Sequence, residues 1–428
     1  MTSLPDTGRL AVDDTGRYRK GFVNLAALTT VQLGNALLPL VAYPLILSVV
    51  GAELFSRIAV TESVMLMILA TVVYSFDIDG VSRIASEQVQ ADKAALSRAF
   101  SEVLTARIAI LVSAATGIVL LSPLLDRETV SLLLMWMLFP LGYVLQSAWF
   151  FQSLERNAVQ ATIVVVSRLG CLFLVYWFIR EPADYFRAPL IIGLSYAIGG
   201  AAVFAYALHR HSIRLTRVPA ARIGEMLRHG KEVFAGNLSV ALYRDSNVLI
   251  LNAFSSPSAV SLYAIAEKMV KVFQAGARPL NQLFYPKVIR ALQDVREPSH
   301  AAFKTVLRYT VPQLAGLAVG IAVLAVAFPF LREWFPEVLA SASGADVLGL
   351  VAVMAISVFF GVANFMFGIG GLNFLGRRWY LARSILTTGV ASVVLCIALT
   401  SQFGAMGAAV TFVLAEVILF AQVARAYA

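Results

Sequence analysis

The sequence predicts an all-α integral membrane protein with about twelve transmembrane helices. Of its 428 residues, 59% are hydrophobic and only 14% are charged, whereas a soluble domain usually carries about 25% charged residues. The apolar residues form blocks near 20 residues long, the length that an α-helix needs to cross about 30 Å of hydrocarbon. Strands of a membrane β-barrel would be shorter and would alternate apolar with polar residues, which these blocks do not.

The apolar blocks place the predicted spans along the whole chain. A polar segment, 1–20, comes first, and the apolar run after it is too long for the core of a cleaved signal peptide. We therefore expect this segment to stay on the protein. The predicted spans are 22–50, 56–77, 99–121, 129–152, 158–179, 188–208, 232–253, 259–284, 306–331, 345–370, 379–400 and 404–425.

The positions of Lys and Arg predict the orientation of these spans. With the N-terminus inside, the cytoplasmic segments hold 23 of the 34 Lys and Arg residues and the outer loops hold 5. Cytoplasmic loops of membrane proteins carry such an excess. We therefore expect both termini in the cytoplasm and an even number of spans. The net charge of +9 then reflects topology and the anionic inner leaflet, and it does not indicate nucleic-acid binding.

The longest connection divides the chain into two halves of six spans. We expect an N-lobe at 21–208, a cytoplasmic linker at 209–231 and a C-lobe at 232–428. Within the linker, Pro219–Gly230 reads as a short amphipathic helix, with Pro near its start and Gly at its end. Such a helix would lie on the membrane surface.

A weak internal repeat supports this division. Val50–Met65 resembles Ser255–Val270, and each segment is a short turn followed by a helix that carries a glutamate. The two glutamates, Glu62 and Glu267, are 205 residues apart. Repeats in the same orientation imply a pseudo-two-fold axis along the membrane normal, with a pathway between the halves.

The span 259–284 carries a polar stripe, which is costly inside a membrane. Its polar residues recur at i, i+4, i+7, i+11 and i+15 and so share one helical face. We expect this face to line a cavity. The alternative is that Glu267 and Lys271 form an internal salt bridge that only stabilises packing. The stripe comprises Glu267, Lys271, Gln274, Arg278 and Gln282, with Lys268 beside it.

Other spans carry isolated charges near their centres. Arg244 and Asp245 are adjacent, so they point about 100° apart and should have different partners. Arg107 lies closer to the inner surface, where its long side chain could snorkel, and Glu416 stands alone in the last span. A structural ion pair between helices remains the alternative for Arg244 and Asp245, and a hydrogen bond to a neighbour remains the alternative for Glu416. The candidates for ion coupling or gating are Asp77, Asp79, Asp245, Glu267 and Glu416, and Arg168 completes the intramembrane charges.

The second predicted span ends near the inner surface with Asp77, Asp79 and Arg83 around Gly80. The alternative for these residues is a salt bridge at the end of the helix.

Cations outnumber anions among these intramembrane residues, which favours an anionic or diphosphate cargo because Arg binds phosphate oxygens in bidentate fashion. Enzyme signatures are missing from the sequence. The four His residues lie in predicted loops without metal-ligand spacing, and no Gly-rich phosphate loop with Lys occurs. Cys171 and Cys396 lie in apolar blocks. We therefore expect no catalytic residue, no metal and no cofactor.

Several segments resemble Wzx-type polysaccharide flippases. The resemblance lies in NLAALTTVQLGNALLPLVAYPLI, VVGAELFSRIAVTESV and SFDIDGVSR near the start, in SAWFFQSLERNAVQATIVVVSRL (Ser147–Leu169), and in the segment Gly236–Val288. Ser153 stands where that family usually has Gly. The resemblance covers roughly 20–290 and is weak after 300.

This resemblance implies membership of the multidrug/oligosaccharidyl-lipid/polysaccharide (MOP) exporter superfamily. Members have two six-helix lobes, as in the MATE multidrug exporters, and work by alternating access. The Wzx branch moves undecaprenyl-diphosphate-linked oligosaccharide across the bacterial inner membrane, which implies membrane lipids, a polysaccharide polymerase and chain-length proteins as partners. By analogy, the cations of the cavity would hold the diphosphate and the saccharide. The substrate-binding residues are then Arg168, Arg244, Lys268, Lys271 and Arg278, with Gln274 beside them.

Three other functions compete with this interpretation. An ion-coupled exporter of drugs or small solutes would have the same fold, but a cationic cavity argues against it. A membrane enzyme of polysaccharide assembly would be expected to carry polar residues in a long outer loop, and the predicted outer loops near 180–187 and 332–344 are short. A scaffold without transport activity would not require costly intramembrane charges.

Overall fold

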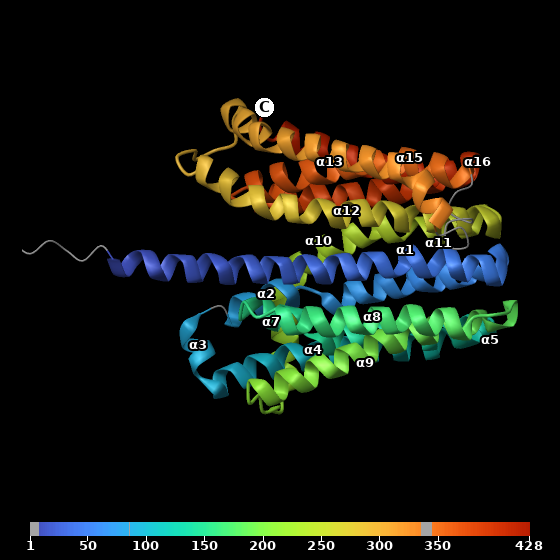
Figure 1. Cartoon of the computed structure of the whole chain (residues 1–428), viewed down its shortest axis with the longest axis horizontal. Coiled ribbons are helices and arrows are strands. Elements are labelled where there is room, and N and C mark those ends of the chain that lie inside the picture. The colour runs from blue at the N-terminus through green and yellow to red at the C-terminus, as the bar shows by residue number, and fades with distance from the viewer. Residues whose placement is uncertain (1–7, 85, 335–344) are drawn as a thin grey trace, which may run out of the picture.

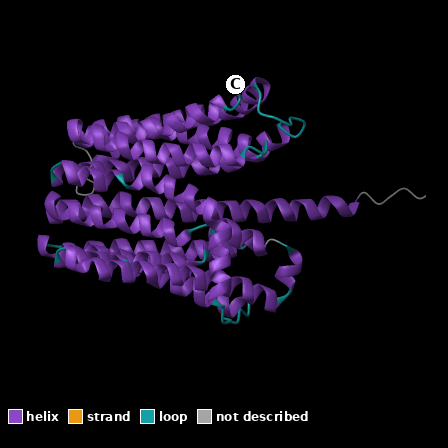
Figure 2. Ribbon diagram, turned by 180° about the vertical axis from the view of Figure 1, so that it is seen from behind, coloured by secondary structure: helices purple, strands orange, loops and turns teal. Residues whose placement is uncertain are grey.

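The computed structural model describes residues 8–84, 86–334 and 345–428. The described residues form helices and short connections without any strand (Figures 1 and 2). The first half consists of α1 (Gly8–Val73), α2 (Phe76–Ile84), α3 (Glu87–Ala91), α4 (Lys93–Leu121), η1 (Ser122–Leu124), α5 (Arg127–Trp136), α6 (Leu138–Gln146), α7 (Ala148–Ser153), α8 (Ala158–Phe178), η2 (Pro182–Phe186) and α9 (Arg187–Arg210).

The second half begins with a helix that carries many polar residues. Its elements are α10 (Ala220–Asp245), α11 (Asn247–Phe254), α12 (Pro257–Ala291), α13 (His300–Trp334), α15 (Ala345–Asn364), the π-helix η3 (Phe365–Asn373) and α16 (Arg378–Arg425).

The helices α1 and α16 each cross the molecule twice, because a glycine within each helix lets the chain bend back. Gly51 in α1 and Gly404 in α16 have φ of 78° and 55°, a region that glycine adopts without steric cost. The chain reverses at both points. The rings of Tyr43 and Phe55, on either side of Gly51, lie 5.8 Å apart. Near the two ends of α16, the Tyr380 hydroxyl donates to the carbonyl of Gln422 at 2.8 Å.

The helices account for the predicted number of spans. Among the described residues, eight helical segments are long and apolar enough to cross a membrane, and the two that bend at Gly51 and Gly404 each supply two passes. The pair α10–α11 and the helix α12 carry more charge but pack within the same bundle (Figure 1). The prediction of an all-α fold of about twelve spans is confirmed.

The helix α1 lies in the middle of the molecule. Figure 1 shows α4, α5, α8 and α9 on one side of it and α12, α13, α15 and α16 on the other. The C-terminus lies toward the end of the bundle from which α1 emerges (Figures 1 and 2). This arrangement accords with a division into two lobes and with both termini on one side of a membrane. The lobes, their boundaries and their pseudo-two-fold relation remain predictions.

The linker differs from its prediction. The expected short helix at Pro219–Gly230 is the first part of α10, which continues to Asp245. Gly230 does not end the helix because it serves packing: a Cβ there would lie 2.0 Å from Ser75 Oγ. The connection that precedes α10 also contacts the first half, since the amide of Arg214 donates to Ser97 Oγ of α4 at 3.1 Å. The linker thus docks on the first half.

The predicted span 129–152 is divided into α5, α6 and α7. It breaks at Met137 and at Ser147, which has φ 44°. Here α6 approaches α9 at two glycines, and a Cβ on Gly142 would lie 2.2 Å from the backbone of Tyr196. A Cβ on Gly200 would lie 2.2 Å from the carbonyl oxygen of Gly142. Small residues allow such close backbone approach in membrane bundles.

We expect Gly142→Ala to lower the free energy of unfolding by about 1–3 kcal/mol, because the added methyl group forces α6 and α9 apart. Chemical unfolding of the purified protein in detergent measures this loss. Gly117→Ala is the matched control, since no atom lies within 4 Å of a Cβ at Gly117. Equal stability of the two variants would contradict the close packing of α6 on α9.

Candidate functional site

A network of buried ion pairs joins α1, α10 and α12. Lys271 Nζ lies 2.9 Å from Asp245 Oδ1 and 3.0 Å from Glu267 Oε1. Its neighbour Lys268 donates to Glu62 Oε1 at 2.8 Å, and only 6% of Lys268 is exposed. The polar stripe therefore contains the internal salt bridge that was the alternative interpretation, but this bridge is one part of a network that connects three helices.

A second ion pair joins α10 to α16. Arg244 Nη2 donates to Glu416 Oε1 at 2.8 Å. The other carboxylate oxygen of Glu416 accepts from Asn364 Nδ2 at 2.8 Å. Arg244 and Asp245 thus have different partners, as their adjacency predicts, and Glu416 has partners on two other helices. Arg244, Asn364 and Glu416 all belong to the second half of the chain.

Of the six predicted intramembrane cations, Arg168 and Arg278 have no carboxylate partner among the described residues. Arg168 donates to Asn35 Oδ1 at 3.1 Å and to Ser195 Oγ at 3.2 Å, and its guanidinium lies 3.3 Å from the ring centroid of Tyr196. Arg278 donates to the carboxamide oxygen of Gln32. Neutral partners leave the full positive charge of both guanidinium groups available to an anion.

Two cavities border this network. The larger, of about 410 Å³, is lined by Arg244, Gln274, Arg278 and Glu416 and by apolar residues of α15, η3 and α16. The smaller, of about 160 Å³, is lined by residues of the first half, which include Asn35, Tyr43, Glu62 and Tyr196, and by Lys268 and Lys271 of α12. The helix α12 therefore contributes residues to both cavities.

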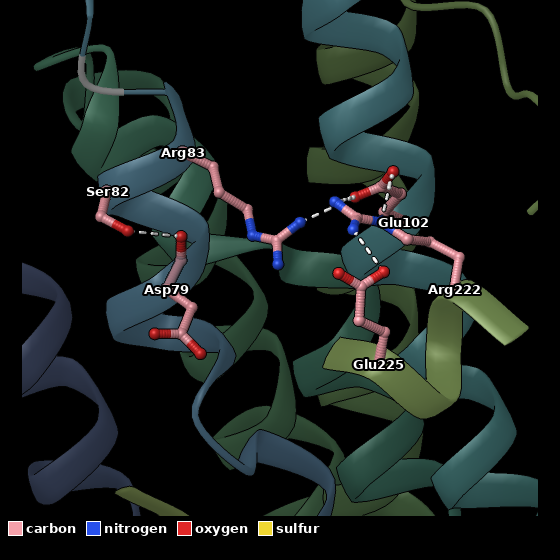
Figure 3. Close-up of polar contacts among 6 residues, drawn as sticks. All are labelled: Asp79, Ser82, Arg83, Glu102, Arg222 and Glu225. Atoms are coloured by element: carbon pink, nitrogen blue, oxygen red, sulfur yellow. Dashed lines mark hydrogen bonds and ion pairs between the residues drawn. The ribbon is translucent and has the colours of Figure 1, made fainter. Parts of the chain in front are cut away.

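Asp77 and Asp79, in the first turn of α2, have separate environments. Asp77 Oδ1 accepts from Arg107 Nη2 at 2.6 Å, and Arg107 is only 1% exposed. Arg107 therefore does not snorkel to the surface. Asp79 accepts from Ser75 Oγ at 2.6 Å, and its carboxylate is turned away from Arg83 in Figure 3.

Arg83 takes part in a separate cluster that involves α2, α4 and α10. It donates to Glu102 Oε2 at 2.7 Å, and Arg222 Nε donates to Glu102 Oε1 at 3.2 Å (Figure 3). Arg222 also pairs with Glu225 at 2.8 Å, which lowers the pKa of the Glu225 carboxyl. The helix-end salt bridge between Arg83 and the aspartates, an alternative from the sequence, is not formed. The cluster instead ties α10 to α2 and α4.

The interior is less cationic than the sequence predicts. Its six cations, Arg107, Arg168, Arg244, Lys268, Lys271 and Arg278, face five paired carboxylates, Glu62, Asp77, Asp245, Glu267 and Glu416. Sequence reasoning noted Glu62 only as a repeat position and placed Asp77 at the inner surface. The surplus of positive charge is therefore small. Arg168 and Arg278 are the two cations without a carboxylate, since Lys271 pairs with both Asp245 and Glu267.

Sequence reasoning also missed three neutral polar residues of the site. Asn364 and Asn281 line the larger cavity, and Tyr196 lines the smaller. Single amides and tyrosines in apolar spans give little signal, because they are much cheaper to bury than charges. Only the packed helices bring them beside the charged residues.

We expect Glu62→Gln to lower the free energy of unfolding by about 3 kcal/mol, because Lys268 would keep a buried charge without its partner. The double variant Glu62→Gln/Lys268→Met should lose less than the sum of the two single variants. Chemical unfolding in detergent measures all three.

The exposed pair of Arg57 with Glu128, whose side chains are 43% and 57% exposed, supplies the control. Glu128→Gln should cost less than about 1 kcal/mol. Strict additivity of the Glu62 and Lys268 substitutions would refute a direct ion pair between them.

Comparison with known proteins identifies relatives over most of the chain. The sequence profile of a family described as polysaccharide biosynthesis protein matches residues 23–291. A protein of Escherichia coli K12 described as an O-antigen transporter is 24% identical over 400 residues, which is 92% of this chain and 93% of the relative. A protein of Shigella dysenteriae with the same description is 21% identical over 269 residues, 62% of this chain and 66% of the relative.

Solved structures of the MOP superfamily share the fold. An inward-facing MATE-family multidrug transporter superposes with a TM-score of 0.65 at 14% identity, covering 94% of this chain and 96% of the other. The lipid II flippase MurJ superposes with a TM-score of 0.62 at 13% identity, covering 94% and 86%. The resemblance seen in the sequence is confirmed, and the relatives are transporters rather than enzymes. The chain belongs to the polysaccharide biosynthesis protein family.

Proposed function

We propose that the protein is a flippase that moves polyprenyl-diphosphate-linked oligosaccharide across the bacterial inner membrane for polysaccharide biosynthesis. The family and the description of both relatives as O-antigen transporters support this class of cargo. Undecaprenyl diphosphate is the carrier lipid that the resemblance implies. A polysaccharide polymerase and chain-length proteins would act on the glycan after it has crossed.

The observation that carries the proposal is the state of Arg278. Its guanidinium lines a cavity of about 410 Å³ and has an amide rather than a carboxylate as partner. A phosphate group would replace this neutral acceptor with a charged one that a guanidinium can bind in bidentate fashion. Apolar residues that also line the cavity, such as Val362, Leu381 and Ile385, suit the lipid part of the cargo.

Alternating access is the mechanism that fits this arrangement. Both cavities border α12, and the ion pairs of Lys268 and Lys271 tie this helix to α1 and α10. A movement of α12 relative to α1 and α10 would require these pairs to separate or to exchange partners. Protonation of a carboxylate, such as Asp245, Glu267 or Glu416, would weaken its pair and so couple the movement to an ion. Asp77 and Asp79 are further candidates for gating.

We expect Arg278→Gln to lower export of the polysaccharide at least tenfold, since a lost charge-assisted hydrogen bond is worth about 1.5–3 kcal/mol. A deletion strain that carries the variant gene, assayed for surface polysaccharide, measures this effect. Arg308→Gln, a change at an exposed residue, is the control and should export normally at equal protein level. Normal export by the triple variant Arg244→Gln/Lys271→Gln/Arg278→Gln would contradict the proposal.

An ion-coupled exporter of cationic drugs or small solutes is the second candidate. Glu62 and Glu416 line the two cavities, which brings more negative charge to the pathway than the sequence indicates. A change in drug resistance of the deletion strain together with normal surface polysaccharide would favour this candidate over the flippase.

The orientation of the chain is a separate prediction. We expect a fluorescent protein fused after Ala428 to fluoresce, because the distribution of Lys and Arg places the C-terminus in the cytoplasm. Alkaline phosphatase inserted between Glu181 and Pro182 should be active, since it would reach the periplasm. The reverse pattern in the two fusions would contradict the orientation.

A further inference from the structure

The larger cavity carries polar groups that lack partners. Four buried atoms of its lining residues form no hydrogen bond with the described residues: Arg244 Nε, Gln274 Nε2, Asn281 Oδ1 and Asn364 Oδ1. A buried polar group without a partner destabilises the protein by about 1–3 kcal/mol. Such groups beside a cavity therefore indicate a ligand that would pair with them.

The orientation of Asn364 is determined by its neighbour. Its Nδ2 donates to Glu416 Oε2 at 2.8 Å and to the carbonyl oxygen of Glu416 at 3.0 Å. Reversing the amide would turn an oxygen toward these two acceptors and lose both bonds. Asn364 Oδ1 is consequently the free atom, and it can only accept a hydrogen bond.

The free groups limit the chemistry of the ligand. Arg244 Nε can only donate and Asn364 Oδ1 can only accept, whereas the amides of Gln274 and Asn281 carry both a donor and an acceptor. An ionised phosphate only accepts and would leave Asn364 Oδ1 unpaired, and an ammonium group only donates and would leave Arg244 Nε unpaired. A hydroxyl group both donates and accepts, so a ligand with several hydroxyl groups satisfies all four atoms.

The shape of the cavity agrees with this chemistry. Its volume of about 410 Å³ lies in the range of small-molecule sites, which is about 300–1,000 Å³. The aromatic residues Tyr243 and Phe365 also line it and offer surface to the C–H groups of a sugar ring. Arg278, on the same helix as Gln274 and Asn281, supplies a charge for a neighbouring phosphate.

We propose that Gln274, Asn281 and Asn364 form a saccharide subsite in the larger cavity and that this subsite selects the glycan. This inference rests on the proposed function and deepens it. Arg278 holds the diphosphate that every cargo shares, whereas the amides contact the hydroxyl groups that differ between glycans. Affinity and selectivity thus depend on different residues of one cavity.

The test compares the binding of two probes to the purified full chain in nanodiscs of phosphatidylethanolamine and phosphatidylglycerol. One probe is undecaprenyl diphosphate, and the other is the undecaprenyl-diphosphate-linked oligosaccharide extracted from the source bacterium. We expect the glycosylated probe to bind roughly tenfold more tightly, since each net hydrogen bond contributes about 0.5–1.5 kcal/mol. The host lipids are common to both measurements and cannot create the difference.

Variants separate the subsite from the phosphate contact. Asn281→Ala and Gln274→Ala should each reduce the preference for the glycosylated probe about threefold or more and leave binding of undecaprenyl diphosphate unchanged. Asn364→Leu should abolish the preference. Arg278→Gln should weaken the binding of both probes by the same factor. Gln402→Ala, at an exposed amide outside the cavity, is the matched control.

The outcomes distinguish this inference from the proposed function. If the unmodified protein binds both probes equally, or if the Asn281 and Gln274 variants weaken both probes alike, the saccharide subsite is refuted while the flippase stands. If the unmodified protein binds neither probe, the proposed function fails and the subsite fails with it. Because Asn281 and Gln274 make no ion pair, their variants keep the test valid even if Asn364→Leu does not fold.

Discussion

The buried ion pairs on α12 are the interaction on which the rest of the structure depends. A charge in the middle of a membrane costs at least about 2.5–3.5 kcal/mol on insertion scales, and α12 carries Glu267, Lys268, Lys271 and Arg278. Three of these are neutralised in pairs with each other or with residues of α1 and α10. The charged face of α12 can therefore be buried only while α1 and α10 lie beside it.

This constraint links the fold to transport. The same helix contributes to both cavities, so a movement of α12 relative to α1 and α10, as the proposed transport requires, would alter the partners of Lys268 and Lys271. Breaking a buried pair is costly, and exchanging one partner for another is much less so. Arg278 differs because it has no carboxylate to leave. It can take an anionic partner at little cost, and for this reason we propose it as a contact for the cargo.

The spans and the polar face of α12 could be predicted from the sequence because both leave strong patterns in it. The length of the apolar blocks gives the spans, and the spacing of Glu267, Lys271 and Arg278 gives one polar face. The partner of Lys268 could not be found in this way, because Glu62 lies 206 residues away and pairing across that distance depends on packing. The prediction of a separate linker helix that ends at Gly230 was wrong because the role of this glycine also depends on packing. It lets α10 approach Ser75.

The central claim is that the protein moves a lipid-linked glycan from one leaflet to the other, and a direct translocation assay tests it. The purified protein would be reconstituted into liposomes with undecaprenyl-diphosphate-linked oligosaccharide in both leaflets. The fraction open to an added glycosidase would then be followed over time. The account predicts that cleavage proceeds from about half of the lipid to nearly all of it, because inner-leaflet molecules move outward. Cleavage that stops at half, as in liposomes without protein, would contradict it.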